Sequence, residues 1–159
     1  MTKVTVIGSG KYGSMTALRV AEYDIVDKVV MTDIVDGLPQ GLALDMNQSR
    51  YVEKFSSKII GTNDYKDTVD SDVVVITAGL PRKPGMCRMD LLEVNTNIVT
   101  DVTNNIIQYS KNPIIIVVTN PLDQMTTLVS DVSGLPKRRV IGLSLIHISE
   151  PTRPLYISY

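Results

Sequence analysis

Three glycines near the start of the chain are spaced as in loops that bind phosphate groups. Gly8, Gly10 and Gly13 lie in the run GSGKYG, between a short β-branched stretch and a segment with helical spacing. Glycine at these positions allows a tight turn, close approach of the backbone to a pyrophosphate and close packing of the following helix, whose first N–H groups favour phosphate. The run predicts a dinucleotide-binding loop. The alternative is a glycine turn that binds no ligand, which can have the same sequence pattern. The residues expected to contact the cofactor are Gly8, Ser9, Gly10, Lys11, Tyr12 and Gly13.

An acidic residue follows the second apolar run of the chain. Asp33 comes directly after the run KVVMT and lies about 20 residues beyond the last glycine of the loop. A carboxylate at this place accepts hydrogen bonds from the adenosine ribose hydroxyls and repels an added 2′-phosphate. Asp33 therefore predicts NAD rather than NADP as the cofactor. The alternative is a solvated loop aspartate.

Small and polar residues end the fourth and fifth apolar runs. The first group is Thr77, Ala78 and Gly79, and the second is Val118, Thr119 and Asn120. In an open α/β sheet, ligands bind beyond the carboxyl ends of the strands, where small residues expose the backbone. We therefore expect both groups to contact the cofactor, although ordinary turn chemistry gives the same composition.

A loop with two arginines follows the fourth apolar run. Prolines and glycines frame Arg82 and Arg88, and the single cysteine, Cys87, lies between them. A guanidinium group can bind a carboxylate through two parallel hydrogen bonds and keeps its charge at every physiological pH. Loop arginines are more often a solvated surface, so their role stays open on these residues alone. Cys87 is interpreted as a bystander, because the sequence places no imidazole to activate it.

Apolar runs alternate with segments of helical spacing along the chain. The expected strands are 4–7, 28–32, 58–60, 72–77, 114–118 and 139–141, and the expected helices are 14–22, 40–46, 91–109 and 126–132. The strands are continuously apolar, as expected for strands that are buried on both faces. This pattern predicts an α/β fold, a doubly wound parallel sheet with helices on both faces.

Composition limits the class of protein. A chain of 159 residues with 43% hydrophobic residues fits one globular domain, and a net charge of −1 gives no basic surface for nucleic acid. No apolar run reaches the roughly 20 residues of a membrane-spanning helix, and no signal peptide is recognised. The single cysteine cannot form an internal disulfide. We expect a cytoplasmic protein without nucleic-acid or membrane partners and without a metal site.

Several motifs together resemble the malate dehydrogenases of the lactate-dehydrogenase superfamily. They are VIGSGKYG, TDIVDGLPQGLALDM, IIGTNDY, ITAGLPRKPGMCRMDLL and VVTNPLD, and the resemblance covers residues 1–142. It implies a Rossmann NAD-binding domain with NAD as cofactor, in a parent enzyme that is a homodimer or homotetramer.

The resemblance also assigns roles to four residues. Arg82 would pair with the distal carboxylate of oxaloacetate or malate, and Arg88 would polarise the reacting carbonyl. Asn120 would touch substrate and nicotinamide, and Asn95 would be a further cofactor contact, unless it lies on an exposed helix face. In the lactate branch a neutral residue is expected in place of Arg82. Arg82 thus argues against the nearest alternative, a lactate or other 2-hydroxyacid dehydrogenase.

The resemblance ends near Gly142. The family's proton-transferring histidine, its aspartate partner and a third arginine are expected beyond this point, but the single histidine, His147, is flanked by Ile146 and Ile148. We interpret 1–142 as the dinucleotide-binding domain and 143–159 as a non-native tail, with the C-terminal substrate domain and the catalytic residues missing. Such a chain is expected to bind NAD without turnover. The other possibility is a stand-alone NAD-binding module.

Overall fold

A computed structural model describes residues 1–144 of the chain, except for the side chain of Arg88. Of the predicted tail at 143–159, all but the first two residues lie outside the described residues, and so does His147. The strands are β1 (Lys3–Ile7), β2 (Lys28–Thr32), β3 (Lys58–Thr62), β4 (Val73–Ile76), β5 (Ile114–Val117) and β6 (Val140–Gly142). The helices are α1 (Lys11–Glu22), α2 (Leu38–Glu53), α3 (Arg88–Tyr109) and α4 (Leu122–Ser133), with 3₁₀ turns η1 (Tyr65–Thr68) and η2 (Lys137–Arg139). None of the helices within residues 1–144 is long and apolar enough to cross a membrane.

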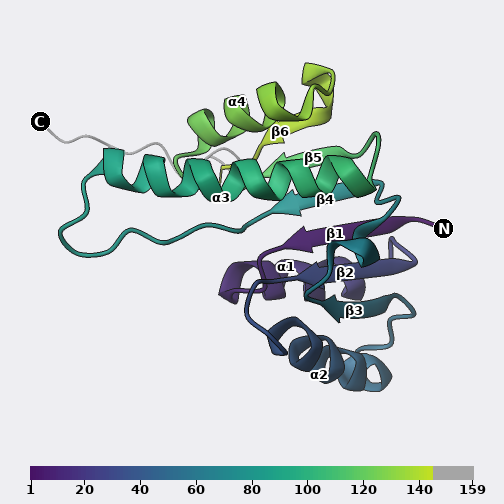
Figure 1. The fold of residues 1–159 in the computed structure, drawn as a ribbon. Coiled ribbons are helices and arrows are strands. Elements are labelled where there is room, and N and C mark those ends of the chain that lie inside the picture. Colours follow the sequence, from purple (N-terminus) through teal and green to yellow (C-terminus); the bar gives the residue numbers. More distant parts are fainter. Residues whose placement is uncertain (145–159) are drawn as a thin grey trace, which may run out of the picture.

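The six strands form one parallel sheet in the order β3-β2-β1-β4-β5-β6. Helices α3 and α4 lie on one side of this sheet and α1 and α2 on the other (Figure 1). The strand order reverses between β1 and β4, and a doubly wound sheet opens a crevice at such a reversal, beyond the carboxyl ends of its strands. The predicted fold class is confirmed, and its crevice lies where the glycine run follows β1.

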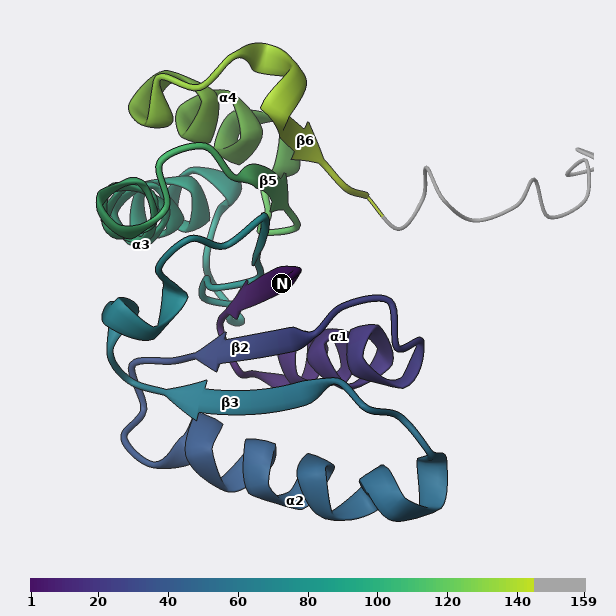
Figure 2. The same cartoon turned by 90° about the vertical axis from the view of Figure 1, so that its right-hand side faces the viewer.

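Alternation along the strands builds a separate core on each face of the sheet. In β1, Val4 and Val6 join the core under α1 and α2, whereas Ile7 joins the core under α3 and α4. In β4, Val75 faces the first core and Ile76 the second. Successive strand residues point to opposite faces, so a strand covered on both sides is mostly apolar along its length. This explains why the strands could be recognised as unbroken apolar runs. Figure 2 shows α2 lying alongside β3 at one edge of the sheet.

The helices start earlier than the sequence-based expectation. Helix α3 begins at Arg88, before the expected 91, because Cys87 caps it: the Cys87 Sγ accepts from the Asp90 N–H at 3.4 Å, and Asp90 Oδ2 accepts from the Cys87 N–H at 2.8 Å. Arg88 is thus the first helical residue and not a loop residue. Helices α1 and α4 also start earlier than expected, at Lys11 and Leu122.

Two further differences concern helix length and a short turn. Helix α2 extends from Leu38 to Glu53, well beyond the expected 40–46, and ends where Lys54 adopts a left-handed conformation with φ 60°. The 3₁₀ turn η1 was not expected. It forms because the Asp64 carboxylate accepts a 2.9 Å hydrogen bond from the Lys66 N–H. Such a local cap is set by a single side chain and leaves no periodic pattern in the sequence.

Candidate dinucleotide and substrate site

A cavity of about 1320 Å³ lies at the carboxyl ends of the strands. Small-molecule pockets usually measure about 300–1,000 Å³, so this cavity has room for an extended ligand. The predicted site residues that line it are Gly8, Gly10, Lys11, Tyr12, Gly13, Asp33, Thr77, Ala78, Gly79, Arg82, Asn95, Val118, Thr119 and Asn120. The structure thus brings together residues that are far apart in the sequence. Ser9 is buried within the glycine loop, and nothing is described of the Arg88 side chain.

Each of the three glycines in the loop is a glycine for a different structural reason. Gly8 has a positive φ of 97°, a conformation that other residues rarely adopt. A Cβ on Gly13 would lie 1.8 Å from the Gly8 carbonyl oxygen, so only glycine lets α1 start this close to β1. A Cβ on Gly10 would meet nothing within 4 Å. The fold does not require glycine at position 10, which leaves the close approach of a ligand as its physical reason.

The start of α1 offers donors toward the same space. Of the described side chains, none caps this helix, and its first turn contains no acidic residue. The first backbone hydrogen bond runs from the Ser14 N–H to the Gly10 carbonyl at 2.9 Å, so the preceding N–H groups of the helix are not used by it. The Ser9 hydroxyl is also buried without a hydrogen-bond partner among the described residues. Free N–H groups and the positive end of the helix dipole suit a phosphate.

Asp33 follows β2 and is held against the glycine loop. Its Oδ2 accepts a 2.6 Å hydrogen bond from the Ser9 N–H, and its Oδ1 accepts a 3.0 Å bond from the Val35 N–H. The carboxylate is partly exposed and lines the cavity. Two backbone donors therefore fix its orientation, while its partly exposed oxygens can accept further hydrogen bonds from a ligand.

The ends of β1, β4 and β5 are tied together by side-chain hydrogen bonds. The Thr77 hydroxyl lies 3.0 Å from the carbonyls of both Ile7 and Gly8, and the Thr119 hydroxyl donates to the Ala78 carbonyl at 2.7 Å. Both threonines also line the cavity. Because hydrogen bonds to buried backbone groups fix local geometry, these threonines set the shape of the cavity floor.

Asn95 extends this bonded set from the middle of α3. Its Nδ2 donates to the carbonyls of Asn120 and Leu80 at 2.7 and 3.3 Å, and its Oδ1 accepts from the Leu80 N–H at 2.8 Å. Asn95 is only 1% exposed. The alternative of a polar residue on an exposed helix face is therefore wrong. The amide links the loop after β4 to the loop after β5 and lines the cavity between them.

The arginine loop extends past the sheet between β4 and α3, as Figure 1 shows. Arg82 is exposed, lines the cavity and donates from Nε to the Met86 carbonyl at 3.0 Å. This bond uses the Nε side of the guanidinium, so both terminal amino groups remain available to a carboxylate. The arrangement places a charged fork at one side of the cavity and the glycine loop at another.

Sequence reasoning missed several residues of the cavity wall. One face of α3 contributes Leu91, Ile98, Asp101, Val102 and Asn105, and other elements contribute Ile34, Asn63, Tyr65 and Leu122. The positions on α3 recur at intervals of three and four from Asn95, so helical spacing could have identified most of them. Asn63 and Tyr65, in the motif IIGTNDY, lie outside the α-helices, so no helical spacing could indicate that they line the cavity.

Tyr65 adds an aromatic wall with a protonated hydroxyl. Its pKa is raised, first by burial and then by the negative charges of Asp101 and Asp33. Burial disfavours the charged phenolate, and two nearby carboxylates add to this effect. Tyr65 therefore stays neutral over the physiological range of pH and offers the cavity a polar group without charge.

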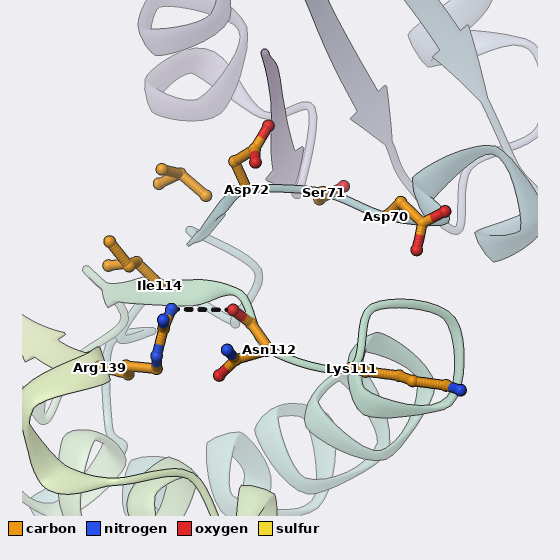
Figure 3. Close-up of a pocket in the computed structure, with 8 residues that line it drawn as sticks. Asp70, Ser71, Asp72, Lys111, Asn112, Ile114 and Arg139 are labelled. Carbon is orange, nitrogen blue, oxygen red and sulfur yellow. Dashed lines mark hydrogen bonds between the residues drawn. The ribbon is translucent and has the colours of Figure 1, made fainter. Parts of the chain in front are cut away.

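A second cavity lies at the opposite, amino ends of β4 and β5. It measures about 460 Å³ and is lined by charged and polar residues that include Asp70, Asp72, Lys111 and Arg139. Figure 3 shows that these charged groups point in different directions, and that the guanidinium of Arg139 donates to the Asn112 carbonyl at 2.9 Å. Charged groups that do not converge form no common binding point. The chemistry of the site is therefore concentrated at the carboxyl ends.

Comparison with known proteins agrees with this geometry. The sequence profile of the lactate/malate dehydrogenase NAD-binding domain matches residues 2–142. A malate dehydrogenase from Pelodictyon phaeoclathratiforme is 56% identical over 142 residues, which are 89% of this chain and 46% of the relative. The chain thus spans about half the length of the curated relatives it matches.

Solved structures of similar sequence have the same fold. The malate dehydrogenase from Salinibacter ruber is 49% identical with a TM-score of 0.84, over 90% of this chain and 45% of that one. The lactate dehydrogenase from Cryptosporidium parvum, complexed with lactic acid and nicotinamide adenine dinucleotide, is 43% identical with a TM-score of 0.84, over the same shares. The family match, the strand order and the glycine loop agree, and the chain belongs to the lactate/malate dehydrogenase family, in which it represents the NAD-binding domain.

Proposed function

We propose that this chain binds NAD(H) in the cavity at the carboxyl ends of its strands, as the NAD-binding part of a malate dehydrogenase. The observation that carries the proposal is the start of α1, where an uncapped helix N-terminus meets the open space above Gly10. A phosphate group suits both features, because it accepts from the free N–H groups and needs the room that a side chain would occupy.

The lining residues fit the parts of NAD in a consistent order. The loop 8–13 would hold the pyrophosphate, and Asp33 would accept from the ribose hydroxyls. The ends of β4 and β5, with Asn95, would surround the nicotinamide. When bound, NAD supplies the acceptor or donor of a hydride. The chain's own contribution is to orient the cofactor and to cover one side of the reacting ring.

For the substrate of the parent enzyme we propose a small dicarboxylate, malate or oxaloacetate. Arg82 supports this choice, because a guanidinium at the edge of the cavity can pair with a second carboxylate that lactate does not have. The proposed roles of Arg88, in polarising the carbonyl, and of Asn120, in touching substrate and nicotinamide, come from their positions in the family motifs. The lactate dehydrogenase relative shares the fold, so the discrimination rests on Arg82.

We further expect the 159-residue chain to bind NADH without catalysing oxidation. The family's reaction needs a histidine for proton transfer, and the only histidine of this sequence, His147, lies between two isoleucines. General acid–base catalysis typically supplies a factor of about 10²–10⁴ in rate. A cytoplasmic location is the setting that we propose, since the single cysteine has no internal disulfide partner.

The test combines two measurements on the full 159-residue chain. NADH is titrated and its fluorescence followed, and oxaloacetate is then added to the complex while NADH absorbance is recorded. The expected result is saturable NADH binding with no oxaloacetate-dependent loss of absorbance. A chain that leaves NADH fluorescence unchanged would contradict the binding proposal, and turnover at the rate of a complete dehydrogenase would contradict the proposed inactivity.

For the parent enzyme we also propose a homodimer or homotetramer. Supporting this, α2 exposes a group of apolar side chains: Leu44 is 63% exposed, Tyr51 90% and Val52 77%. Exposed apolar patches on soluble proteins commonly mark contact surfaces. Light scattering after size-exclusion chromatography measures the assembly directly, and a strictly monomeric chain with this face exposed would argue against the proposal.

A further inference from the structure

Asn63 clamps the loop that carries Asp33. Its Nδ2 donates to the backbone carbonyls of Asp33 and Val35, at 2.7 and 2.9 Å. Its Oδ1 accepts from the Gly37 N–H at 3.3 Å and from Gln40 Nε2 at 2.6 Å. A single amide therefore spans the loop from its first residue to the start of α2. Only an amide supplies two donors and an acceptor in this arrangement.

Packing contributes little to holding this loop. Ile34 is 97% exposed and Val35 is 53% exposed, so neither side chain is fixed by burial. Gly37 has a positive φ of 73°, in the region where glycine is the most permissive residue. Because the loop lacks buried side chains, hydrogen bonds define its path, and those from outside the loop and α2 come from Asn63 and, at the Asp33 carboxylate, from the Ser9 N–H.

The clamp acts on the backbone of Asp33, whereas the glycine loop acts on its carboxylate. The Ser9 N–H holds the Asp33 carboxylate at 2.6 Å, and Asn63 holds the carbonyl of the same residue. Backbone and side chain of Asp33 are thus fixed by two separate elements. Both side-chain donors of Asn63 are engaged with the loop, so its amide group has no N–H left for a ligand, although Asn63 lines the cavity.

We infer that Asn63 is a positioning residue that sets the selectivity for NADH over NADPH through Asp33. This inference rests on the NAD-binding function proposed above. Repulsion of a 2′-phosphate by Asp33 depends on where the carboxylate is held, because both hydrogen bonding and charge repulsion fall off with distance. Loosening the loop weakens the contact with the ribose hydroxyls and at the same time relieves the repulsion of the phosphate.

The test measures dissociation constants of NADH and NADPH for the full chain and for Asn63→Ala. The NADH constant is expected to rise about three- to tenfold, as for the loss of a hydrogen bond, with a smaller change for NADPH. The ratio of the two constants therefore falls. Asn104→Ala, the same change on an exposed face of α3, is the matched control and should leave the ratio unchanged.

Two further variants separate positioning from a general structural role. In the Asp33→Asn background, Asn63→Ala should change the ratio little more, because Asn63 acts through Asp33. Gln40→Ala removes only the 2.6 Å bond to Asn63 and should shift the ratio in the same direction by less, in a chain whose exposed helix position tolerates alanine. This variant keeps the test available if Asn63→Ala does not fold.

The outcomes distinguish this inference from the proposed function. Equal weakening of NADH and NADPH, an unchanged ratio in both Asn63→Ala and Gln40→Ala, or additive effects of the Asn63 and Asp33 changes would each overturn the positioning role while leaving NAD binding intact. Failure of the unaltered chain to bind NADH would overturn the proposed function itself.

Discussion

The Nδ2 of Asn95 donates a 2.7 Å hydrogen bond to the backbone carbonyl of Asn120. The same amide holds both backbone polar groups of Leu80. One buried side chain on α3 thus joins the start of the loop after β4 to the loop after β5. Movement of either loop is thereby coupled to the other, and both border the proposed nicotinamide site.

Replacing Asn95 with leucine should destabilise the chain. The change leaves three backbone groups without their partner, and each unsatisfied buried group costs about 1–3 kcal/mol. We expect a total loss of roughly 2–4 kcal/mol in the free energy of unfolding, measured by urea denaturation, because water can reach part of the site. Asn97→Leu on the exposed face of the same helix is the control. Equal stability of the two variants would show that the hydrogen bonds of Asn95 do not stabilise the fold.

Thr119 and Asn95 both tie β4 to β5, so their effects should be coupled. Thr119→Val keeps the side-chain shape and removes the 2.7 Å bond to the Ala78 carbonyl. Alone it should cost about 0.5–1.5 kcal/mol. Combined with Asn95→Leu, the loss should differ from the sum by about 0.5 kcal/mol or more, as found for residues that share a bonded set. Strict additivity in denaturant titrations would indicate that the two links act independently.

The glycines at positions 10 and 13 should separate stability from binding. Gly13→Ala places a Cβ 1.8 Å from the Gly8 carbonyl oxygen, so the start of α1 must shift and thermal stability should fall. Gly10→Ala meets nothing within 4 Å and should leave the melting temperature nearly unchanged. It should nevertheless weaken NADH binding about tenfold or more, because the new methyl group occupies the space that the pyrophosphate needs.

Gly41→Ala is the control for this pair. Gly41 lies inside α2 with open space at its Cβ position, and alanine in a helix is favoured over glycine by about 0.5–1 kcal/mol. This variant should therefore be slightly more stable and bind NADH as the unaltered chain does. If Gly10→Ala also bound NADH normally, the pyrophosphate would have to lie elsewhere in the cavity.

The sheet was predictable because its central strands are buried on both faces. Val74, Ile76 and Ile115, for example, are 0% exposed, and such strands appear in the sequence as unbroken apolar runs. Helix starts were less predictable; that of α3, for example, depends on a reciprocal pair of hydrogen bonds between Cys87 and Asp90 that leaves no periodic pattern. The glycine loop and Asp33 could be placed from spacing, since their positions follow directly from the ends of β1 and β2.

The polar links of the site could not be predicted in the same way. The burial of Asn95 could have been predicted from helical spacing, because Asn95 lies on the same helical face as Ile98 and Val102. Its partners were not, because Leu80 and Asn120 belong to two separate loops. Asn63 is a stronger case: it is exposed, and the carbonyls it holds lie on another element about 30 residues earlier. Contacts of this kind depend on the tertiary fold.

Acid should weaken the hydrogen-bonded link between the loop after α1 and the loop before β3. Asp24, after α1, accepts hydrogen bonds from the N–H and hydroxyl groups of both Ser56 and Ser57, at distances of 2.8–3.1 Å. Its pKa is lowered from 3.8, first by the Ser56 hydroxyl and then by the backbone N–H groups of Ser56 and Ser57. A lowered pKa in the folded state means that the charged form stabilises the fold above the unfolded pKa.

Asp24→Asn should therefore lower the melting temperature at neutral pH, with a difference that disappears in acid. Asparagine tolerates the left-handed backbone at position 24, where φ is 51°, so the change removes the charge without added backbone strain. The difference from the unaltered chain should be constant above about pH 5 and shrink as the pH falls below about 4, because Asp24 is then protonated in the unfolded state first; it is lost once the pH also passes the lowered pKa of the folded state. Thermal melts across this range measure it, with Asp131→Asn on the exposed face of α4 as control. A difference that persists at low pH would show that the carboxylate charge is not what stabilises this link.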